Sequence, residues 1–600
     1  MKNFKIFHLV LASSICSTGL TSEARTVNLL EPKISQIEPD IGDVDAPYVS
    51  QQEEIQSQLL LLSRQHPELK WLQDLVRDEM FSQNEMPGPL LAENGSSGTR
   101  MPAQVSGLGK KAFFLNKAKK LVSSGQYQEA SKLLFQMAVS PMYINESAQI
   151  KYILGLMLYE LKLHQSAAFI FYDVVRQESG NTRSKYLRQS LEKLSLAADA
   201  LNSDVLLKFA IKKINENDFP PAQRDMLFYR MGEVKLQDKN FKEAAQAFVR
   251  VRPTSTYYSK ARYNLALALA EAGDTPHARE AFDDLYANSP ERITDRNRVD
   301  SILGKARVLY QGKDWDTAIE TYRLIPRDTE QWHESLFESS WAMLRSGKFR
   351  SALSNFHSLH SPFYEDFYQP ESFILRAIVY LYICRYEEMD KILNLFERIY
   401  KPVQSSIRNS LVSDRTPETY YREITQVANN YDAIRTKKAG SRGSLRLPFV
   451  VARQVLKESD VRKAQSYLSK LIDEQRRLAQ FPVSWTTSGV GKYSKRVVEK
   501  RVEATRSFIG RLVRRHLILL QNDLRDLFEQ VGFLRFEKTS GQKAVLKKEI
   551  QGKGLAIHID DDDNRDYFIQ NGYEYWPFKG EYWLDEIGNY HYVGVQACEK

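Results

Sequence analysis

The chain repeats one pattern of small and apolar positions at the spacing of a helical hairpin. In each copy a small residue is followed twelve positions later by alanine, and four positions after that by a large apolar residue. Residues four apart lie on one face of an α-helix, so the alanine and the apolar residue belong to the second helix of a pair. Copies start 34 residues apart at Gly232 and Ala266, and again at Ala306 and Ser340. The pattern therefore predicts consecutive two-helix units.

Six copies of the pattern are clear, and turn residues separate their helices. The copies are Ala118/Ala130/Leu134, Gly155/Ala167/Phe171, Gly232/Ala244/Phe248, Ala266/Ala278/Phe282, Ala306/Ala318/Tyr322 and Ser340/Ala352/Phe356. Gly125, Gly273 and Gly347 fall between helices, and Pro141 and Pro290 follow second helices, where proline ends a helix. Degenerate copies at 181–219 and 370–400 bring the total to seven or eight.

This arrangement resembles the tetratricopeptide repeat family. Aromatic residues that enter the second helix three positions before the alanine, such as Trp315 and Phe349, are a further shared feature. The resemblance covers residues 110–402, about half of the chain. It implies an all-α solenoid with a concave surface that binds other proteins. The small residues that would pack its helices are Gly155, Ala167, Gly232, Ala244, Ala266, Ala278, Ala306, Ala318 and Ala352.

The resemblance also implies where a partner would bind. In tetratricopeptide proteins, one flank of each first helix faces the concave side, and here that flank carries aromatic residues with Glu233, Arg307 and Glu334 beside them. Aromatic anchors supply much of the affinity of a protein interface. The competing interpretation is that several of them only pack against neighbouring first helices. The row consists of Tyr152, Tyr159, Tyr229, Tyr263, Tyr310, Phe337 and Trp341.

Residues 403–555 lose the repeat period but stay helical in pattern. A Lys/Arg/Gly-rich break at 435–446 precedes helical stretches at 448–481 and 492–537. The second stretch has apolar residues every eleven positions at Val498, Ile509, Leu520 and Val531, which form a nearly straight stripe along a helix. Such a stripe requires a partner helix. We expect a long antiparallel hairpin with the preceding stretch, and the alternative is self-association.

The last segment, 556–600, changes character again. An acidic run, Asp560 to Asp563, precedes a region dense in tyrosine and tryptophan. Two extended stretches, 581–587 and 590–595, flank Gly588-Asn589, which predicts a small β-hairpin. Such a hairpin could cover the open end of the solenoid, or stack on sugar rings or a partner.

The first 24 residues resemble a secretory signal peptide. Lysines precede a short apolar core, and Ser22-Glu23-Ala24 has small residues where signal peptidase needs them. We therefore expect export to the periplasm and cleavage near Ala24. Cys16 raises a lipoprotein alternative, although Ile15 is bulky where a lipobox has a small residue. Residues 25–109 are rich in turn formers and predict a mostly disordered tether with one helix at about 52–81.

Charge, cysteine content and motifs argue against catalysis without naming a partner. The net charge of +9 permits an acidic protein, an anionic membrane surface or nucleic acid, and export disfavours nucleic acid. Two cysteines, Cys384 and Cys598, remain after cleavage, and a bridge between them stays open. His357 and His360 lack a third metal ligand nearby, and the acidic run lacks the glycine and distal glutamate of a calcium loop. The sequence predicts no enzyme, no cofactor and no metal site.

The sequence as a whole predicts a non-enzymatic periplasmic scaffold that binds envelope proteins or peptides. The stretch 361–386 is loosely similar to periplasmic tetratricopeptide proteins of deltaproteobacteria, some tied to gliding motility or envelope assembly. One alternative is a protein that binds peptidoglycan or a membrane surface through the basic second helix and the aromatic segment. Another is a helical cell-wall hydrolase, which would need a compact catalytic domain that 403–600 does not indicate.

Overall fold

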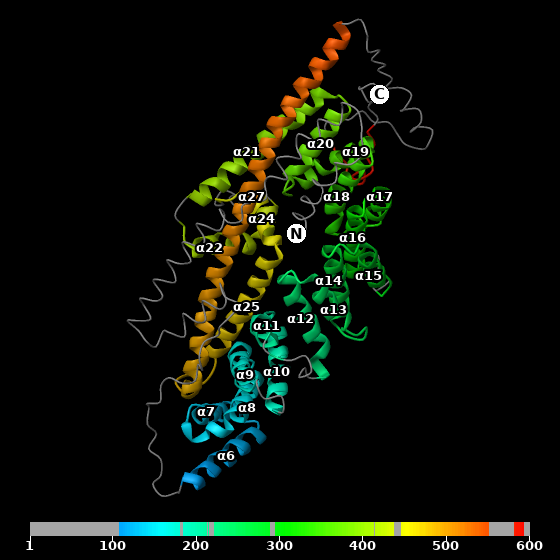
Figure 1. The fold of residues 1–600 in the computed structure, drawn as a ribbon. Coiled ribbons are helices and arrows are strands. Elements are labelled where there is room, and N and C mark those ends of the chain that lie inside the picture. The colour runs from blue at the N-terminus through cyan, green and yellow to red at the C-terminus, as the bar shows by residue number, and fades with distance from the viewer. Residues whose placement is uncertain are drawn as a thin grey trace. The chain divides into compact units, whose positions relative to one another are not determined.

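The computed structural model describes residues 107–179, 184–212, 214, 221–288, 295–412, 415–436, 446–550 and 581–592 (Figure 1). Within these ranges the regular structure is entirely helical, so the predicted all-α solenoid class is confirmed for them. The signal peptide, Cys16, the tether up to residue 106, the acidic run and Cys598 lie outside the described residues.

Eight helical hairpins follow one another from Gly107 to Val412 in the described part of the chain. Their pairs are α6 (Gly107–Ser123) and α7 (Tyr127–Ala138), α8 (Ser147–Glu160) and α9 (His164–Glu178), α10 (Lys185–Leu201) and α11 (Val205–Ile211), α12 (Arg224–Gln237) and α13 (Phe241–Val249), α14 (Tyr258–Glu271) and α15 (Thr275–Ala287), α16 (Arg296–Gln311) and α17 (Trp315–Arg323), α18 (Gln331–Arg345) and α19 (Phe349–Leu359), and α20 (Pro370–Tyr382) and α21 (Tyr386–Val412). Short 3₁₀ helices lie at η3 (Pro141–Glu146), η5 (Pro221–Gln223) and η6 (Pro362–Tyr364).

Every one of these hairpins turns through a single residue in the left-handed backbone region. The eight residues, with φ between 53° and 82°, are Gly125, Lys162, Asn202, Lys239, Gly273, Lys313, Gly347 and Cys384. Glycine adopts this region without steric cost, whereas other L-residues pay about 1 kcal/mol or more. The sequence reveals the three glycine turns, but a lysine or cysteine at the same position gives no local signal.

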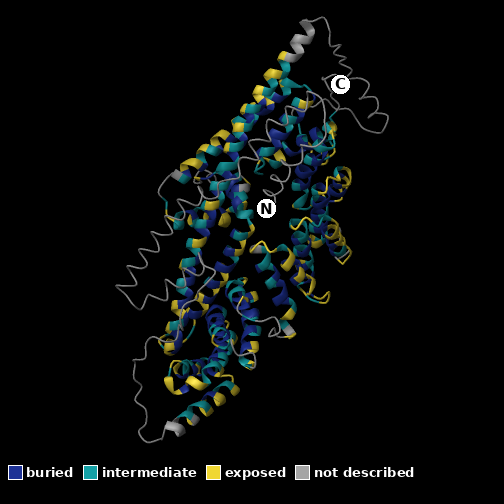
Figure 2. Ribbon diagram, viewed as in Figure 1, coloured by how far each residue is buried: buried dark blue, intermediate teal, exposed yellow. Residues whose placement is uncertain are grey.

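The repeated small residues are the points of close helix contact. Gly155 and Ala167 are buried, and Phe171 packs so tightly that a Cβ on Gly155 would lie 2.6 Å from its ring (Figure 2). A similar contact joins Gly304 to Phe282, where the added Cβ would lie 2.3 Å away. The alanines at the repeated position of the second helices are all buried: Ala130, Ala167, Ala244, Ala278, Ala318 and Ala352.

The helices beyond the hairpins differ in extent from the sequence expectation. Helix α21 continues through Pro402 to Val412, and the stretch expected at 448–481 is divided at Glu458. The remaining helices are α22 (Pro417–Asn429), α23 (Tyr431–Arg435), α24 (Phe449–Lys457), α25 (Ser459–Ala479), α26 (Val483–Thr486) and α27 (Gly489–Ile550). No helix among the described residues is both long and apolar enough to cross a bilayer.

The chain divides into two compact units, and both contain pieces of the later helices. Unit 1 comprises 1–234 and 463–508, and unit 2 comprises 235–462 and 509–600. The boundaries therefore fall inside α12, α25 and α27.

In unit 1, α25 and the segment after it attach to the first hairpins through buried polar contacts. Glu474 of α25 accepts hydrogen bonds from the backbone N–H groups of Gln165 (2.8 Å) and Ser166 (3.2 Å), in the first turn of α9. These N–H groups have no partner within their own helix, so a carboxylate there caps it. The indole Nε1 of Trp485, itself buried, donates to Ser131 Oγ at 3.0 Å.

In unit 2, the second half of α27 packs against α21 and α22. The rings of Phe396 and Phe528 lie 4.9 Å apart, and Arg535 donates to Asn394 and Glu397 at 2.9 Å. Gly510 approaches the backbone of Pro417 so closely that no Cβ would fit there.

Helices α25 and α27 run in opposite directions along each other. Arg501 donates to the hydroxyl of Tyr467 at 3.0 Å within unit 1, and within unit 2 Arg515 and His516 contact Asp460 at 2.6 and 2.9 Å. Later residues of one helix thus meet earlier residues of the other. The predicted stripe Val498, Ile509, Leu520 and Val531 is buried.

The β-hairpin predicted at 581–595 is wrong for the described residues. Residues 581–592 contain a turn at 584–589 and no strand, and 593–600 lie outside the described residues. Two backbone N–H groups that a hairpin would use differently, those of Gly588 and Tyr592, donate to side chains of α19 instead. Contacts with the solenoid therefore replace strand pairing.

Candidate protein-binding face of unit 2

The first helices of three successive hairpins in unit 2 share a charged and aromatic surface. We call it the first-helix face and define it as Tyr263 of α14, Arg307 of α16, and Glu334, Glu338 and Trp341 of α18. Glu334 and Trp341 are seven residues apart, which is two helical turns, so both lie on one side of α18.

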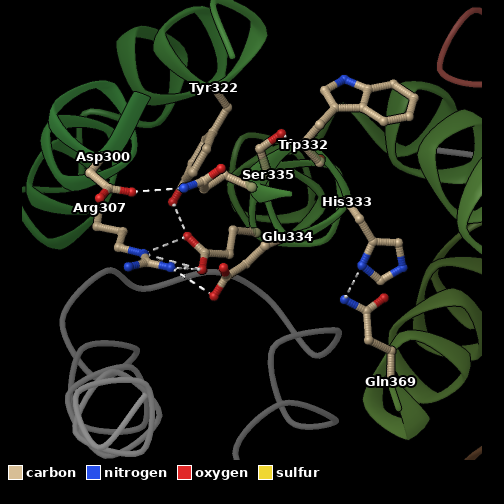
Figure 3. A network of polar contacts seen from close by, with 10 residues as sticks. Asp300, Arg307, Tyr322, Trp332, His333, Glu334, Ser335 and Gln369 are labelled. Atoms are coloured by element: carbon tan, nitrogen blue, oxygen red, sulfur yellow. Dashed lines mark hydrogen bonds and ion pairs between the residues drawn. The ribbon is translucent and has the colours of Figure 1, made fainter. Parts of the chain in front are cut away.

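Arg307 is the centre of this face (Figure 3). Its guanidinium donates to both carboxylate oxygens of Glu338, at 2.9 Å from Nε and 2.6 Å from Nη2, and to Glu334 at 2.9 Å. The hydroxyl of Tyr322, from α17, donates to Glu338 at 3.0 Å. A bidentate pair of this kind fixes the guanidinium plane and thereby the spacing between α16 and α18.

Burial and charge act against each other in this network. Burial raises the pKa of the Glu338 carboxyl above its ordinary value, and the attraction of Arg307 only partly offsets this effect. Burial alone would lower the pKa of Arg307, but Glu338 and Glu334 outweigh it and raise that pKa well above its ordinary range. Glu338 is 4% exposed, whereas the side chain of Glu334 keeps 38% of its exposure. Glu334 is therefore the carboxylate that a partner can reach.

The seven predicted aromatic residues divide into two groups by burial. Tyr229, Tyr310 and Phe337 are buried, and the ring of Tyr310 packs 4.8 Å from that of Trp315. Packing accounts for these three. The half-buried group keeps surface for a ligand, and its role in binding stays a prediction: Tyr152, Tyr159, Tyr263 and Trp341.

Tyr263 belongs to the same environment as Arg307. Its ring lies 5.7 Å from that of Phe282. Burial raises the pKa of its hydroxyl, which feels Arg307, Asp300 and Glu334 as neighbouring charges. In unit 1, Tyr229 donates to Glu233 at 3.2 Å, and Arg230 pairs with Glu233 at 2.8 Å, so the predicted Glu233 has a packing partner of its own.

His333 closes one end of the face and is part of the packing. Its ring lies 4.0 Å from Phe367 and 4.5 Å from Tyr364, and its Nδ1 is 3.2 Å from the side-chain nitrogen of Gln369 (Figure 3). Burial, together with nearby cations, lowers the pKa of His333 to about 3. The imidazole is thus neutral near pH 7.

Potential metal ligands in the described residues already have other partners. His360 contacts Ser372 at 2.9 Å and Arg376 at 3.1 Å, and His357 stacks on tyrosines of the C-terminal segment. One three-residue group with metal-like spacing, Glu458, Asp460 and His516, occurs in the described part of the chain, and Arg515 already pairs with its aspartate. Cys384 is disulfide-bonded.

Sequence reasoning missed Glu338 and Glu474. Both are acids within helices, and helical pattern alone assigns an acid to solvent. The usable signal for Glu338 was its place two residues before Ser340, in the segment that packs against the next hairpin.

Comparison with known families gives one match. Residues 229–293 match a family model described as Tetratricopeptide repeat, and this range covers most of α12 and all of α13, α14 and α15. The match and the helical hairpins support the tetratricopeptide repeat superfamily. A search among curated proteins finds no match to the chain. The tetratricopeptide resemblance is thus supported, and the link to deltaproteobacterial gliding or envelope machinery stays a prediction.

Proposed function

We propose that this chain is a non-enzymatic scaffold whose first-helix face in unit 2 binds a segment of another polypeptide. The observation that carries the proposal is the half-exposed pair Tyr263 and Trp341 beside a fixed Arg307–Glu334 ion pair. Stacked tetratricopeptide hairpins present extended surfaces of this kind to protein partners. Aromatic anchors would supply apolar contact, and the rigid charges would set the register of the bound segment.

A pair of matched substitutions tests the proposal. Glu334→Gln removes the reachable carboxylate of the face, and Glu320→Gln makes the same change in an exposed Arg323–Glu320 pair on α17. In pull-downs from crosslinked cells, we expect Glu334→Gln and Trp341→Ala to lose a protein that the wild type and Glu320→Gln retain. Thermal unfolding checks that the variants fold. An identical set of captured proteins in all four chains would contradict the proposal.

We also propose that the scaffold works in the periplasm, as part of an envelope complex. Support comes from the first 24 residues, with their lysines, apolar core and Ser22-Glu23-Ala24. Amino-terminal sequencing of the chain from a periplasmic fraction should begin at Arg25. Recovery of the chain from the cytoplasm with Met1 or its second residue at the terminus would contradict this location.

A further inference from the structure

Residues 581–592, the tail segment, lie against α19 in unit 2 and make the contacts of a bound peptide (Figure 1). The backbone N–H of Gly588 donates to Ser358 Oγ at 2.8 Å, and that of Tyr592 donates to Ser354 Oγ at 2.9 Å. Each serine hydroxyl donates its own proton to a carbonyl four residues earlier in α19. Its lone pairs therefore remain to accept an amide from a passing chain.

Side chains add to these main-chain contacts. The ring of His357 lies 5.0 Å from Tyr582 and 4.6 Å from Tyr590. Arg327 donates to the carbonyl oxygen of Asp585 at 3.1 Å and also contacts the side chain of Asn589. Guanidinium, imidazole and hydroxyl groups of the solenoid thus each have a specific counterpart on the tail segment.

The fit requires the particular sequence of the tail segment. Ile587 is 1% exposed, so it is a buried anchor within an otherwise accessible stretch. Gly588 has φ = 86°, and a Cβ there would lie 2.6 Å from the indole of Trp332. Any other residue at 588 would meet both a backbone penalty and a clash.

The tail segment also holds its own shape. The N–H of Glu586 donates to Trp583 O at 3.2 Å, and that of Asn589 donates to Glu586 O at 2.8 Å. The N–H of Trp583 donates to the hydroxyl of Tyr590 at 3.2 Å. These bonds do not involve the solenoid, so the segment can carry its turn to another docking surface. Pre-organisation of this kind lowers the entropic cost of binding.

We propose that the tail segment of one copy of this chain docks on the solenoid of a second copy. The tail-docking surface consists of Arg327, Trp332, Ser354, His357 and Ser358. A second copy offers an identical surface and an identical segment, so every contact described above can form between copies. Thirty residues, 551–580, join the described end of α27 to Glu581. A stretch of that length spans at most about 100 Å when extended, enough to reach a neighbouring molecule.

Concentration decides between the two arrangements. A tethered segment sees its own surface at an effective concentration near the millimolar range, so docking within one chain dominates in dilute solution. Exchange between copies becomes favourable where chains are crowded together, as in an assembly. The inference is independent of the first-helix face, because it involves other residues and another partner.

Two complementary full-length variants test the exchange. Arg327→Glu/His357→Ala damages the docking surface and leaves the tail segment intact. Ile587→Asp/Gly588→Ala damages the tail segment and leaves the surface intact. Both are prepared with a thiol reductant, because Cys384 is disulfide-bonded. Circular dichroism confirms that each variant keeps the helix content of the wild type.

Sedimentation of each variant alone, at high concentration, should give the mass of one chain, because neither has both an intact surface and an intact tail. An equimolar mixture should give a species of twice that mass, and an excess of a synthetic peptide of residues 581–592 should dissociate it. A mixture that stays at the mass of one chain would overturn the proposal. So would association of either variant alone, because exchange could not cause it.

Discussion

Gly155 shows how much of this fold is decided by single small residues. Its missing side chain lets the ring of Phe171 occupy the space where a Cβ would lie, 2.6 Å from the nearest ring carbon. Closely packed interiors resist added volume, since a methyl group must displace neighbours that already touch. The repeat signature is therefore a packing requirement, and the requirement is local enough to be read from the sequence.

Gly155→Ala should destabilise the chain, whereas Gly532→Ala should not. Both glycines are helical, but no heavy atom lies within 4 Å of the Cβ position at Gly532. We expect Gly155→Ala to lower the free energy of unfolding by about 1–3 kcal/mol through overpacking. At Gly532 the gain in helix propensity should raise it by up to about 1 kcal/mol. Urea unfolding of both variants measures the difference, and equal effects at the two sites would contradict the packing argument.

The same scale explains why the candidate site could be only partly predicted. Phe337 and Trp341 occupy the same flank of α18 by sequence, yet Phe337 is buried and Trp341 is half-exposed. Periodicity gives the direction of a side chain from its own helix, but the neighbouring hairpin decides whether it is covered. Binding tests should therefore change Trp341, because a Phe337 substitution would also disturb the core.

At the scale of elements, local patterns identified the hairpins but not the contacts that bring distant elements together. The twelve-residue and four-residue spacings locate both helices of a repeat, since they arise within one hairpin. The capping of α9 by Glu474 joins residues 308 apart in sequence, and no local pattern announces it. The β-hairpin expectation failed for a similar reason: Ser354 and Ser358 of α19 take the amides that a strand pair would use.

Glu474 gives this contact between α25 and α9 a distinct dependence on pH. Burial raises the pKa of its carboxyl from 4.5 to about 7, although hydrogen bonds from Gln165 and Ser166 oppose the shift. The folded chain therefore holds this proton more tightly than the unfolded chain. The associated stability is fully present below pH 4.5 and is lost as the pH rises to about 7.

Glu474→Gln should remove that loss. From pH 5 to pH 8, we expect the free energy of unfolding of the variant to rise relative to the wild type by about 2–3 kcal/mol, since one pKa unit corresponds to about 1.4 kcal/mol. Denaturant unfolding of both chains at the two pH values gives this difference. A constant difference between the chains at both pH values would show that Glu474 does not titrate in this range.

At the scale of the whole molecule, the chain combines a repetitive array with helices that return to it. The eight hairpins supply surface, and α25 and α27 contribute to both compact units. A protein built in this way has its chemistry on faces rather than in a closed pocket. Its function therefore depends on which face a partner occupies, and the first-helix face of unit 2 is the one with exposed aromatic and ionic groups together.

Site-specific photo-crosslinking in living cells tests that conclusion most directly. A photoreactive amino acid placed at Glu334 probes the first-helix face, and the same substitution at Glu320 probes the exposed side of α17 as the matched control. We predict that position 334 crosslinks to one discrete polypeptide and that position 320 does not. The absence of any crosslinked polypeptide at 334, or the same product at both positions, would contradict the account.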